Sequence, residues 1–312
     1  VSVTGCGKAK SVVENGYPVY GESSSVNVLS GAEDTVSSYF GANLCVGGTE
    51  NIGQESVEHN SVAEAAGVFN TATNTITYAQ NIYERMYPAS TTKILTAYLA
   101  IKYGNLSDVV TISDNAVNLA SDSSKCGLQA GDQMTLQDLL YGLMLRSGND
   151  AAIAIAEHIS GSVEAFVDLM NQEAQQLGAT GSHFMNPNGL PDENHYTTVY
   201  DLYLIFQKAL QDETFYQLIS TSSYTTNYTA ADGSAKTQDW SSTNQYKTGE
   251  SKLPDGFTLV GGKTGTTGDA GFCLVLLTDN AGGQPVISIV LKADCKSNLY
   301  LMMNEILAGC GN

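Results

Sequence analysis

Ser90 and Lys93, in the segment Ser90-Thr-Thr-Lys93, form a candidate catalytic pair. Side chains three positions apart on a helix share one face, with Cβ atoms about 5 to 6 Å apart. A serine hydroxyl becomes nucleophilic when a neighbouring base accepts its proton, and an amine is such a base when burial and a second cation keep it neutral. An N-cap serine followed by a solvated lysine is the alternative. The apolar residues that follow disfavour it, because they leave Lys93 little room at the surface.

A second candidate is Ser147-Gly148-Asn149, which stands at the joint between two apolar segments. A short joint of this kind can project a hydroxyl and an amide into a cleft. The alternative is a Ser/Asn cap for the helix that begins at Asp150. By itself the segment favours the cap.

The third candidate is Lys263-Thr264-Gly265-Thr266, which ends a strand-like run after Gly261-Gly262. The glycines allow close approach of a neighbour or ligand, and a cation here suits an anionic group. A phosphate-binding P-loop would need glycine at position 257, where Phe257 stands, and a helix rather than a turn after the threonine. Nucleotide binding is therefore excluded. The sequence also has no Gly-x-Ser-x-Gly elbow, which removes the usual α/β-hydrolase interpretation.

Ser-x-x-Lys, Ser-x-Asn and Lys-Thr-Gly, in this order, form the set shared by penicillin-binding proteins and serine β-lactamases. Over about residues 63 to 310 the sequence resembles the low-molecular-mass D-alanyl-D-alanine carboxypeptidases. The segments that carry this resemblance are Pro88-Ala-Ser-Thr-Thr-Lys93, Ser147-Gly-Asn-Asp-Ala-Ala152, His183-Phe-Met-Asn-Pro-Asn-Gly-Leu190, His195-Tyr-Thr-Thr198 with Asp201-Leu202, and Gly262-Lys-Thr-Gly265.

The resemblance implies a role for each motif residue. Ser90 would be the acylated nucleophile and Lys93 its base, while Ser147 would relay a proton to the departing amine, with Lys93 and Asn149 fixing its hydroxyl. The substrate carboxylate would be held at the segment Lys263 to Thr266, by the Lys263 ammonium and the Thr264 and Thr266 hydroxyls, with Gly265 between them. The backbone N–H groups of Ser90 and Thr266 would form the oxyanion hole.

The implied activity is removal of the last D-alanine from peptidoglycan stem peptides through an acyl-enzyme, without a cofactor or metal. β-Lactam antibiotics, which mimic the D-Ala-D-Ala end, would acylate Ser90. Members of the family are bacterial cell-wall enzymes outside the cytoplasmic membrane, so the resemblance also implies an extracytoplasmic site in the cell envelope. His183 and His195 are interpreted as structural, because the amine already fills the role of base.

Two other functions stay open. A class A β-lactamase would carry a Glu-x-x-x-Asn pair between Asn149 and Lys263, which the sequence lacks, and aspartate where Gly148 stands. A non-catalytic penicillin-binding sensor would act with a membrane-spanning segment, and no run approaches about 18 apolar residues. Both departures favour the carboxypeptidase.

The helices and strands around these residues can be predicted from periodicity and from turn signals. A capping box of Thr135 and Asp138 precedes a predicted helix over Leu139 to Leu145. An apolar helix opens at Pro88-Ala89-Ser90 and stops at Gly104, and its apolar residues on most sides predict an interior position. Further helices are predicted at 150–159, 163–177, 198–210 and 298–307, and strands at 67–69, 75–78, 257–262, 272–277 and 286–291.

This order predicts an α/β (α+β) fold like that of β-lactamases and DD-peptidases. An antiparallel sheet from both chain ends would be flanked by helices, with an inserted all-helical subdomain at about 115–250. Within it, 221–252 is polar and predicts strands or loops over the helices. Residues 1–62, without periodicity, predict an N-terminal extension or stalk ahead of a DD-peptidase domain at 63–312.

The composition excludes several classes of partner. With 32 acidic and 14 basic residues, the chain of 312 carries a formal net charge of −18, which repels nucleic acids and anionic lipids. An anionic substrate must therefore be held by a few placed cations.

Six cysteines stand without a Cys-x-x-Cys pair beside four histidines, which disfavours a zinc site. They allow 15 disulfide pairings, and their spacing selects none. Cys273, in an apolar run, is predicted to be a buried thiol. Val3-Thr-Gly-Cys6 resembles the end of a bacterial lipoprotein signal, which predicts a membrane tether through Cys6. A disulfide at Cys6 is the alternative.

Overall fold

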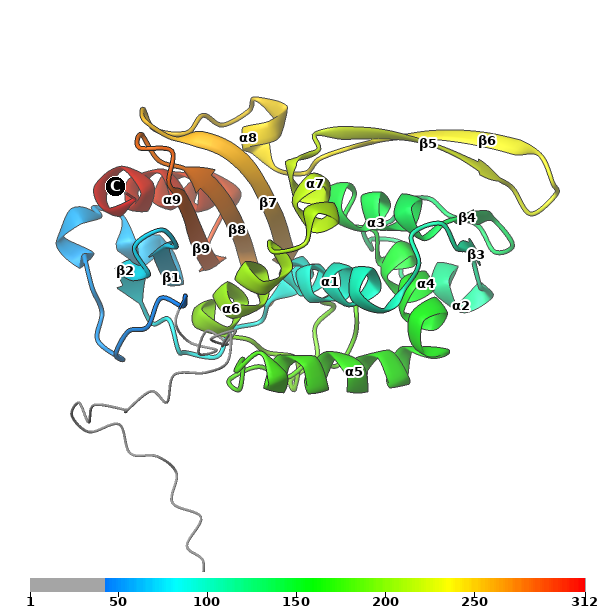
Figure 1. The fold of residues 1–312 in the computed structure, drawn as a ribbon, viewed down its shortest axis with the longest axis horizontal. Coiled ribbons are helices and arrows are strands. Elements are labelled where there is room, and N and C mark those ends of the chain that lie inside the picture. The colour runs from blue at the N-terminus through cyan, green and yellow to red at the C-terminus, as the bar shows by residue number, and fades with distance from the viewer. Residues whose placement is uncertain (1–42, 312) are drawn as a thin grey trace, which may run out of the picture. The chain divides into compact units, whose positions relative to one another are not determined.

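Residues 43–311 are described by the structure, a computed structural model, and Figure 1 shows how they fold. The strands are β1 (Ala63–Asn70), β2 (Thr75–Gln80), β3 (Val109–Thr111), β4 (Gln133–Thr135), β5 (Ser223–Thr229), β6 (Ala235–Ser241), β7 (Thr258–Thr267), β8 (Gly271–Asp279) and β9 (Pro285–Ala293). The α-helices are α1 (Lys93–Tyr103), α2 (Asp114–Val117), α3 (Leu136–Leu145), α4 (Asn149–Ser160), α5 (Val163–Gln176), α6 (Val199–Ala209), α7 (Glu213–Ser220), α8 (Gln245–Thr248) and α9 (Lys296–Cys310). The 3-10 turns are η1 (Gln54–Ser56), η2 (Asn60–Val62) and η3 (Ala89–Thr92).

Strands from both ends of the described chain form one antiparallel sheet in the order β2-β1-β9-β8-β7. The antiparallel pairing of β1 with β9 joins the strands from the two ends, and it begins where Ala63 pairs with Ala293. The β1–β2 turn is closed by Asn70, whose Oδ1 accepts the N–H groups of Ala72 and Thr73 at 3.1 and 3.2 Å. The predicted sheet built from the two chain ends is confirmed.

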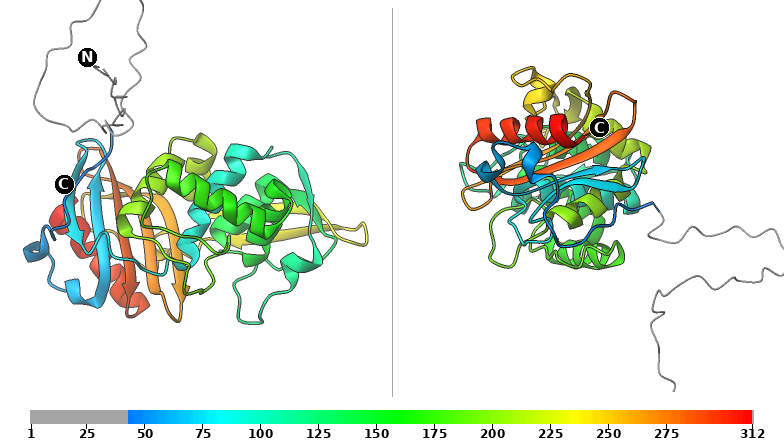
Figure 2. Two further views of the ribbon diagram at one scale, coloured as in Figure 1. Left: turned by 90° about the horizontal axis from the view of Figure 1, so that it is seen from below. Right: turned by 90° about the vertical axis from the view of Figure 1, so that its left-hand side faces the viewer.

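Helices cover both faces of this sheet (Figure 2). Helix α9 lies on one face, where buried Met302 and Met303 belong to the same apolar cluster as Leu276 of β8 and Val290 of β9. Helix α6 lies on the other face, and α1 packs against α6. The sheet is therefore buried on both sides, and its edge strand β7 packs against turn η3, which leads into α1.

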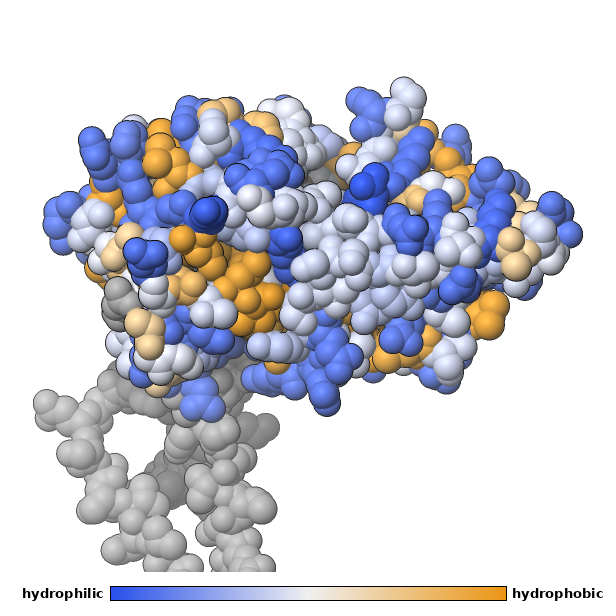
Figure 3. Space-filling model, turned by 90° about the horizontal axis from the view of Figure 1, so that it is seen from above, coloured by the Kyte–Doolittle hydropathy of each residue, from blue (hydrophilic) through white to orange (hydrophobic). Residues whose placement is uncertain are grey.

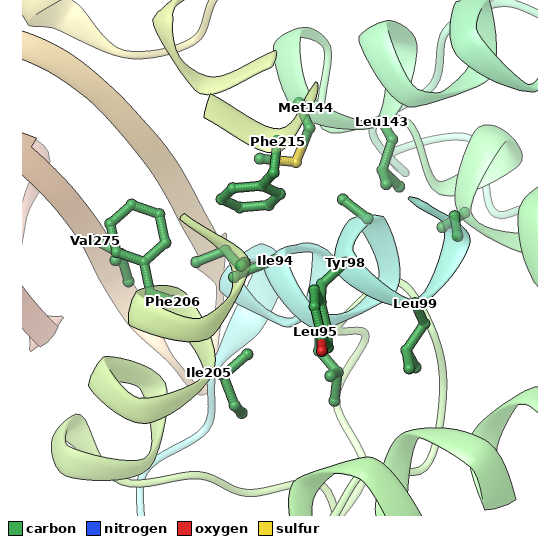
Figure 4. Close-up of a cluster of buried hydrophobic side chains, with 14 of the residues drawn as sticks. Ile94, Leu95, Tyr98, Leu99, Leu143, Met144, Ile205, Phe206, Phe215 and Val275 are labelled. Carbon is green, nitrogen blue, oxygen red and sulfur yellow. The ribbon is translucent and has the colours of Figure 1, made fainter. Parts of the chain in front are cut away.

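Helix α1 runs through the middle of the helical half, and Figure 4 shows the side chains around it. Every residue from Lys93 to Ala100 is buried, so the predicted interior position of this helix is confirmed. Gly104 follows its end, as predicted. Burial of each large apolar side chain contributes roughly 1.5 to 3 kcal/mol. The side chains packed here include Ile94, Leu95, Tyr98, Leu99, Leu143, Met144, Ile205, Phe206, Phe215 and Val275.

The predicted capping box at the start of α3 is confirmed. Thr135 Oγ1 accepts the N–H of Asp138 at 3.1 Å, and Asp138 Oδ2 accepts the N–H of Thr135 at 3.3 Å. Caps of this kind contribute about 1 kcal/mol. Helices α4, α5 and α6 also start and end within a few residues of the predicted ranges.

The insertion between the outer strands is not all-helical, and this part of the prediction is wrong. Strands β3, β4, β5 and β6 form a second sheet in that order. The β5–β6 hairpin projects past the helices in Figure 1 and is held by Trp240, which is 2% exposed. A Cβ on Gly142 of α3 would lie 3.2 Å from the Trp240 ring, so the contact with α3 is close. Seen from above, the hairpin side of the molecule is mostly hydrophilic to neutral (Figure 3).

Residues 43–62, which the prediction placed in the extension, pack against the domain. Ile52 and Ala79 exchange backbone hydrogen bonds of 2.8 and 3.0 Å, and the N–H of Cys45 donates to the Tyr203 hydroxyl at 2.8 Å. Turns η1 and η2 contact α9. The compact unit therefore begins before the predicted boundary at residue 63.

The described cysteines carry free thiols. Cys273 is fully buried in β8, as predicted. Cys6, the predicted site of a lipid anchor, lies outside the described residues. Within residues 43–311, no helix combines the length and the apolar character needed to cross a bilayer.

Candidate active site

Ser90 and Lys93 come together where turn η3 passes into α1. Lys93 is completely buried, and its Nζ lies 2.9 Å from Ser90 Oγ. The same Nζ donates to Asn149 Oδ1 at 2.7 Å and to the backbone carbonyl of Asn188 at 2.6 Å. Ala89 just before the serine has φ 47°, a left-handed conformation that is strained for a residue with a Cβ. The turn therefore presents Ser90 in a fixed orientation.

The hydrogen-bond partners of Lys93 determine the direction in which the lone pair of its neutral amine points. The oxygens of Asn149 and Asn188 can only accept, so each takes one N–H of the amine. The remaining position on Nζ faces Ser90 Oγ. In the neutral amine this position is the lone pair, which accepts the hydroxyl proton. Burial, and then the nearby charge of Lys263, hold the pKa of Lys93 well below its ordinary value, which favours this neutral form.

A second lysine and serine face this pair from β7 and from the joint between α3 and α4. Lys263 is 1% exposed, and its Nζ donates to Ser147 Oγ at 3.0 Å and to the Thr264 carbonyl at 2.8 Å. Burial lowers the pKa of Lys263 to about 7. Ser147 has φ 57°, so the joint is a left-handed turn that aims its hydroxyl at the strand.

Gly265 allows β7 to pass close to the nucleophile. Residues 263 and 265 lie on the same face of a strand, and a Cβ at Gly265 would stand 3.0 Å from the backbone nitrogens of both Ser90 and Thr91. Lys263 can therefore reach Ser147 while the strand itself touches η3. This explains the glycine in Lys-Thr-Gly on steric grounds.

Gly148 has a similar steric reason. A Cβ there would stand 2.2 Å from Cys126 Sγ, so the middle position of Ser-x-Asn must be small in this chain. The loop that carries Cys126 is held by the buried carboxylate of Asp150, which accepts the N–H groups of residues 126, 127 and 128 at 2.8 to 3.2 Å.

That loop also holds Asn149 in place. Asn149 Nδ2 donates to Ser123 Oγ at 2.7 Å, and the Asn149 N–H donates to the Ser124 carbonyl at 2.9 Å. These contacts fix which amide atom faces Lys93. The sequence analysis did not assign Ser123, Ser124, Asp150 or the Asn188 carbonyl to the site, although Asp150 and Asn188 stand in segments that carry the family resemblance.

Two pockets meet at Ser90. The strand-side pocket, of about 230 Å³, is lined by Ser90, Ser124, Ser147, Thr243, Thr264, Gly265, Thr266, Phe272, Cys273, Lys296, Leu299 and Tyr300. The loop-side pocket, of about 270 Å³, is lined by Ser90, Ala120, Asp122, Ser123, Ser124, Asn149, Asn188, Gly189, Leu190, Pro191, Thr266, Thr267 and Gly268. Of the two site lysines and Lys296, only Lys296 lines the strand-side pocket. Lys263 lies behind Ser147, which it contacts, and lines neither pocket. The exposed cation at the pocket wall is Lys296, which the sequence analysis did not identify.

The histidines do not form a triad with the serine. His195 is 1% exposed, its Nε2 lies 2.9 Å from Thr92 Oγ1, and its Nδ1 accepts the N–H of Met185 at 3.0 Å. His183 Nδ1 lies 2.7 Å from the Asn194 carbonyl. Because Nδ1 of His195 accepts, the neutral ring carries its proton on Nε2 and donates it to Thr92. His195 therefore joins the 183–197 loop to the turn that carries Ser90.

We expect His195 to make the free energy of unfolding pH-dependent. Burial lowers its pKa to about 4, against about 6.5 in an unfolded chain. Between these values the unfolded chain binds a proton that the folded chain does not. His195 therefore destabilises the fold by about 3 kcal/mol as the pH falls from 7 to 4. Urea unfolding across this range should show that loss, and His195→Gln should reduce it. An equal pH slope in the variant would contradict the assignment.

Within residues 43–311, Glu58, His59 and Glu305 are the one group of His, Cys or carboxylate side chains close enough to share a cation. His59 Nδ1 already lies 2.5 Å from Glu305 Oε1. None of the three lines the pockets at Ser90.

Residues 52–295 match the model of the Peptidase S11 family, described as D-alanyl-D-alanine carboxypeptidase. The D-alanyl-D-alanine carboxypeptidase DacF of Bacillus subtilis is 34% identical over 265 residues, which are 82% of this chain and 64% of DacF. The D-alanyl-D-alanine carboxypeptidase of Streptomyces sp. strain K15 is 35% identical over 267 residues, which are 81% of this chain and 89% of that relative. This chain therefore spans less than two thirds of DacF and most of the Streptomyces relative.

A solved structure has the same fold. The crystal structure of the Streptomyces K15 DD-transpeptidase matches with a TM-score of 0.72 and 32% identity, over 79% of this chain and 97% of that one.

Proposed function

Because the chain belongs to the D-alanyl-D-alanine carboxypeptidase family, we propose that it is a serine carboxypeptidase that removes the terminal D-alanine from peptidoglycan stem peptides. The observation that carries this proposal is the buried Lys93 amine, 2.9 Å from Ser90 Oγ. Across the same site, a second buried lysine contacts Ser147. Two lysine and serine pairs at one strand edge suit acyl transfer, which moves a proton onto and off the serine.

In the acylation step, Ser90 Oγ attacks the carbonyl carbon of the penultimate residue and its proton passes to Lys93 Nζ. The backbone N–H groups of Ser90 and Thr266 stabilise the negative charge that develops on the carbonyl oxygen. When the C–N bond breaks, Ser147 relays the proton held by Lys93 to the departing amine, so that Ser147 and the Lys93 amine both end the step neutral. Lys263 holds the Ser147 hydroxyl in position for that transfer.

The substrate's terminal carboxylate lies in the strand-side pocket. There the Thr264 and Thr266 hydroxyls donate to it, and Lys296 supplies a positive charge at the pocket wall. Lys263 contributes its charge from behind Ser147. These groups offset the repulsion that a chain with a net charge of −18 exerts on an anion.

In the second step, water attacks the carbonyl carbon of the Ser90 ester and gives a proton to the neutral Lys93 amine. Lys93 passes this proton to Ser90 Oγ as the ester C–O bond breaks, and the shortened peptide leaves as a carboxylic acid. A β-lactam acylates Ser90 in the same way, but its ring nitrogen stays attached to the acyl group after the amide opens. The leaving group therefore does not depart, and it obstructs the water that would hydrolyse the ester. Slow turnover of penicillin follows from the same geometry.

A proposed peptidoglycan substrate supports an activity outside the cytoplasmic membrane, in the bacterial cell envelope. A lipid tether through Cys6 stays a prediction. The acidic surface disfavours nucleic acid as a partner.

The test measures D-alanine release from a peptide that ends in D-Ala-D-Ala, together with hydrolysis of benzylpenicillin. Release of D-alanine with slow penicillin turnover is expected. Rapid penicillin hydrolysis would indicate a β-lactamase, and a stable adduct with neither activity would indicate a sensor. Because one structural neighbour is titled a DD-transpeptidase, the assay is repeated with an amine acceptor. If the acyl group passes mainly to the amine, hydrolysis is not the main reaction.

A further inference from the structure

The two pockets at Ser90 differ in charge. Lys296 lines the strand-side pocket, whereas Asp122 is the one charged residue that lines the loop-side pocket. No lysine or arginine is among the described residues lining that second pocket. The charge therefore changes sign along the cleft, positive on one side of the nucleophile and negative on the other.

The position of the motif residues shows which part of a substrate each pocket would take. Ser147, the proposed donor to the leaving amine, lines only the strand-side pocket, whereas Asn149 and Asn188 line only the loop-side pocket. Since Ser90 lines both, a peptide that crosses it has its leaving D-alanine on the strand side. Its acyl part, including the residue before the two D-alanines, then lies on the loop side.

The wall of the loop-side pocket is fixed against the nucleophile. Gly189 has φ 86°, and a Cβ there would stand 1.8 Å from the Ala89 carbonyl oxygen, so the loop touches the turn that carries Ser90. Asn186 Oδ1 accepts the N–H groups of Gly189 and Leu190 at 2.7 and 3.1 Å. Leu190, which is 39% exposed, gives this wall an apolar side chain that suits a run of methylene groups.

The Asp122 carboxylate has no ion pair with another described residue. Lys125, three positions later, donates instead to the Leu119 carbonyl at 3.3 Å. The carboxylate at the pocket wall is therefore free to bind a cation that enters with the substrate.

We propose that Asp122 is a specificity residue that binds a free primary ammonium on the side chain of the residue preceding D-Ala-D-Ala. The preferred acyl donor is thus a peptide with an unmodified diamino acid at that position. This inference rests on the proposed carboxypeptidase function. Leu190 packs against the aliphatic part of the side chain, and Asp122 accepts hydrogen bonds from its terminal ammonium.

The test compares two peptides that differ only in that charge, Nα-acetyl-L-lysyl-D-alanyl-D-alanine and its Nα,Nε-diacetyl form. The wild-type chain should release D-alanine from the free amine with a kcat/KM about fivefold higher, the size expected for an exposed ion pair. Asp122→Asn should bring this ratio close to one by slowing the free amine, with the diacetyl peptide unchanged. Asp255→Asn, an exposed aspartate outside both pockets, should keep the wild-type ratio.

Each contrary result has one meaning. Equal rates on the two peptides in the wild-type chain, or an unchanged ratio in Asp122→Asn, would overturn the role of Asp122. A ratio that falls equally in Asp255→Asn would reduce it to a general effect of net charge. Release from neither peptide would count against the carboxypeptidase function itself. The rate of penicillin labelling of Asp122→Asn, expected at the wild-type value, reports whether its acylation site is intact.

Discussion

Replacing Ser90 with alanine should abolish covalent labelling of the chain by benzylpenicillin and lower D-alanine release at least about a thousandfold. The Ser90 hydroxyl is the one that faces Lys93 Nζ, and the other site serine, Ser147, faces Lys263 instead. Among residues 43–311, no second hydroxyl is therefore activated by the neutral Lys93 amine. Intact-mass measurement after incubation with penicillin, alongside the D-alanine assay, reads out both effects.

A matched variant, Ser234→Ala in the exposed β5–β6 turn, should label like the wild-type chain. Because Ser90→Ala removes one partly exposed oxygen, its melting temperature should stay close to the wild-type value. An adduct that forms on Ser90→Ala at the wild-type rate would locate the nucleophile on another residue and refute the mechanism.

The catalytic side chains can be predicted from the sequence more directly than the groups that hold them in place. Ser-x-x-Lys, Ser-x-Asn and Lys-Thr-Gly can be recognised because each needs particular side chains at fixed spacing. The Asn188 carbonyl, which takes one N–H of Lys93, cannot be recognised in this way, since every residue has such a carbonyl. Lys296 is equally unmarked, because it enters the pocket from a helix that begins 33 positions after Lys263.

The fold was predictable where patterns are long. The α1 interior position follows from apolar residues on most of its sides, and the α3 boundary follows from Thr135 and Asp138. Strands β3 and β4 have three residues each, too few for alternation to be visible. Helix α7 is absent from the prediction although Asp212 caps it and Phe215 and Leu218 form its buried face. Eight residues make only about two turns, which is a weak periodic signal.

The N-terminal boundary was misplaced for another reason. Residues 43–62 are held by single contacts to distant segments, such as Cys45 to Tyr203 and Ile52 to Ala79. Contacts of that kind need no periodicity in the segment itself. Tertiary contacts, rather than local pattern, therefore decide where this compact unit begins.

The second large effect is expected for Lys93→Met, which keeps an unbranched side chain of similar length but removes the base. The rate constant for acylation by benzylpenicillin should fall by a factor of about 10² to 10⁴, the usual contribution of a positioned base. D-Alanine release should fall by a similar factor. The exposed Lys252→Met serves as the matched control and should acylate at the wild-type rate. Stopped-flow or quenched mass measurements give these rates.

Two further consequences separate loss of the base from loss of the fold. Methionine leaves the buried oxygens of Asn149 and Asn188 without the amine's N–H groups, which should cost about 1 to 3 kcal/mol for each oxygen, offset in part because no amine is buried. The nucleophile and the proposed oxyanion donors stay in place, so a Ser90 adduct should still accumulate over hours in Lys93→Met, unlike in Ser90→Ala. Acylation of Lys93→Met within threefold of the wild-type rate would mean that another group accepts the Ser90 proton, although the amine lies nearest to it.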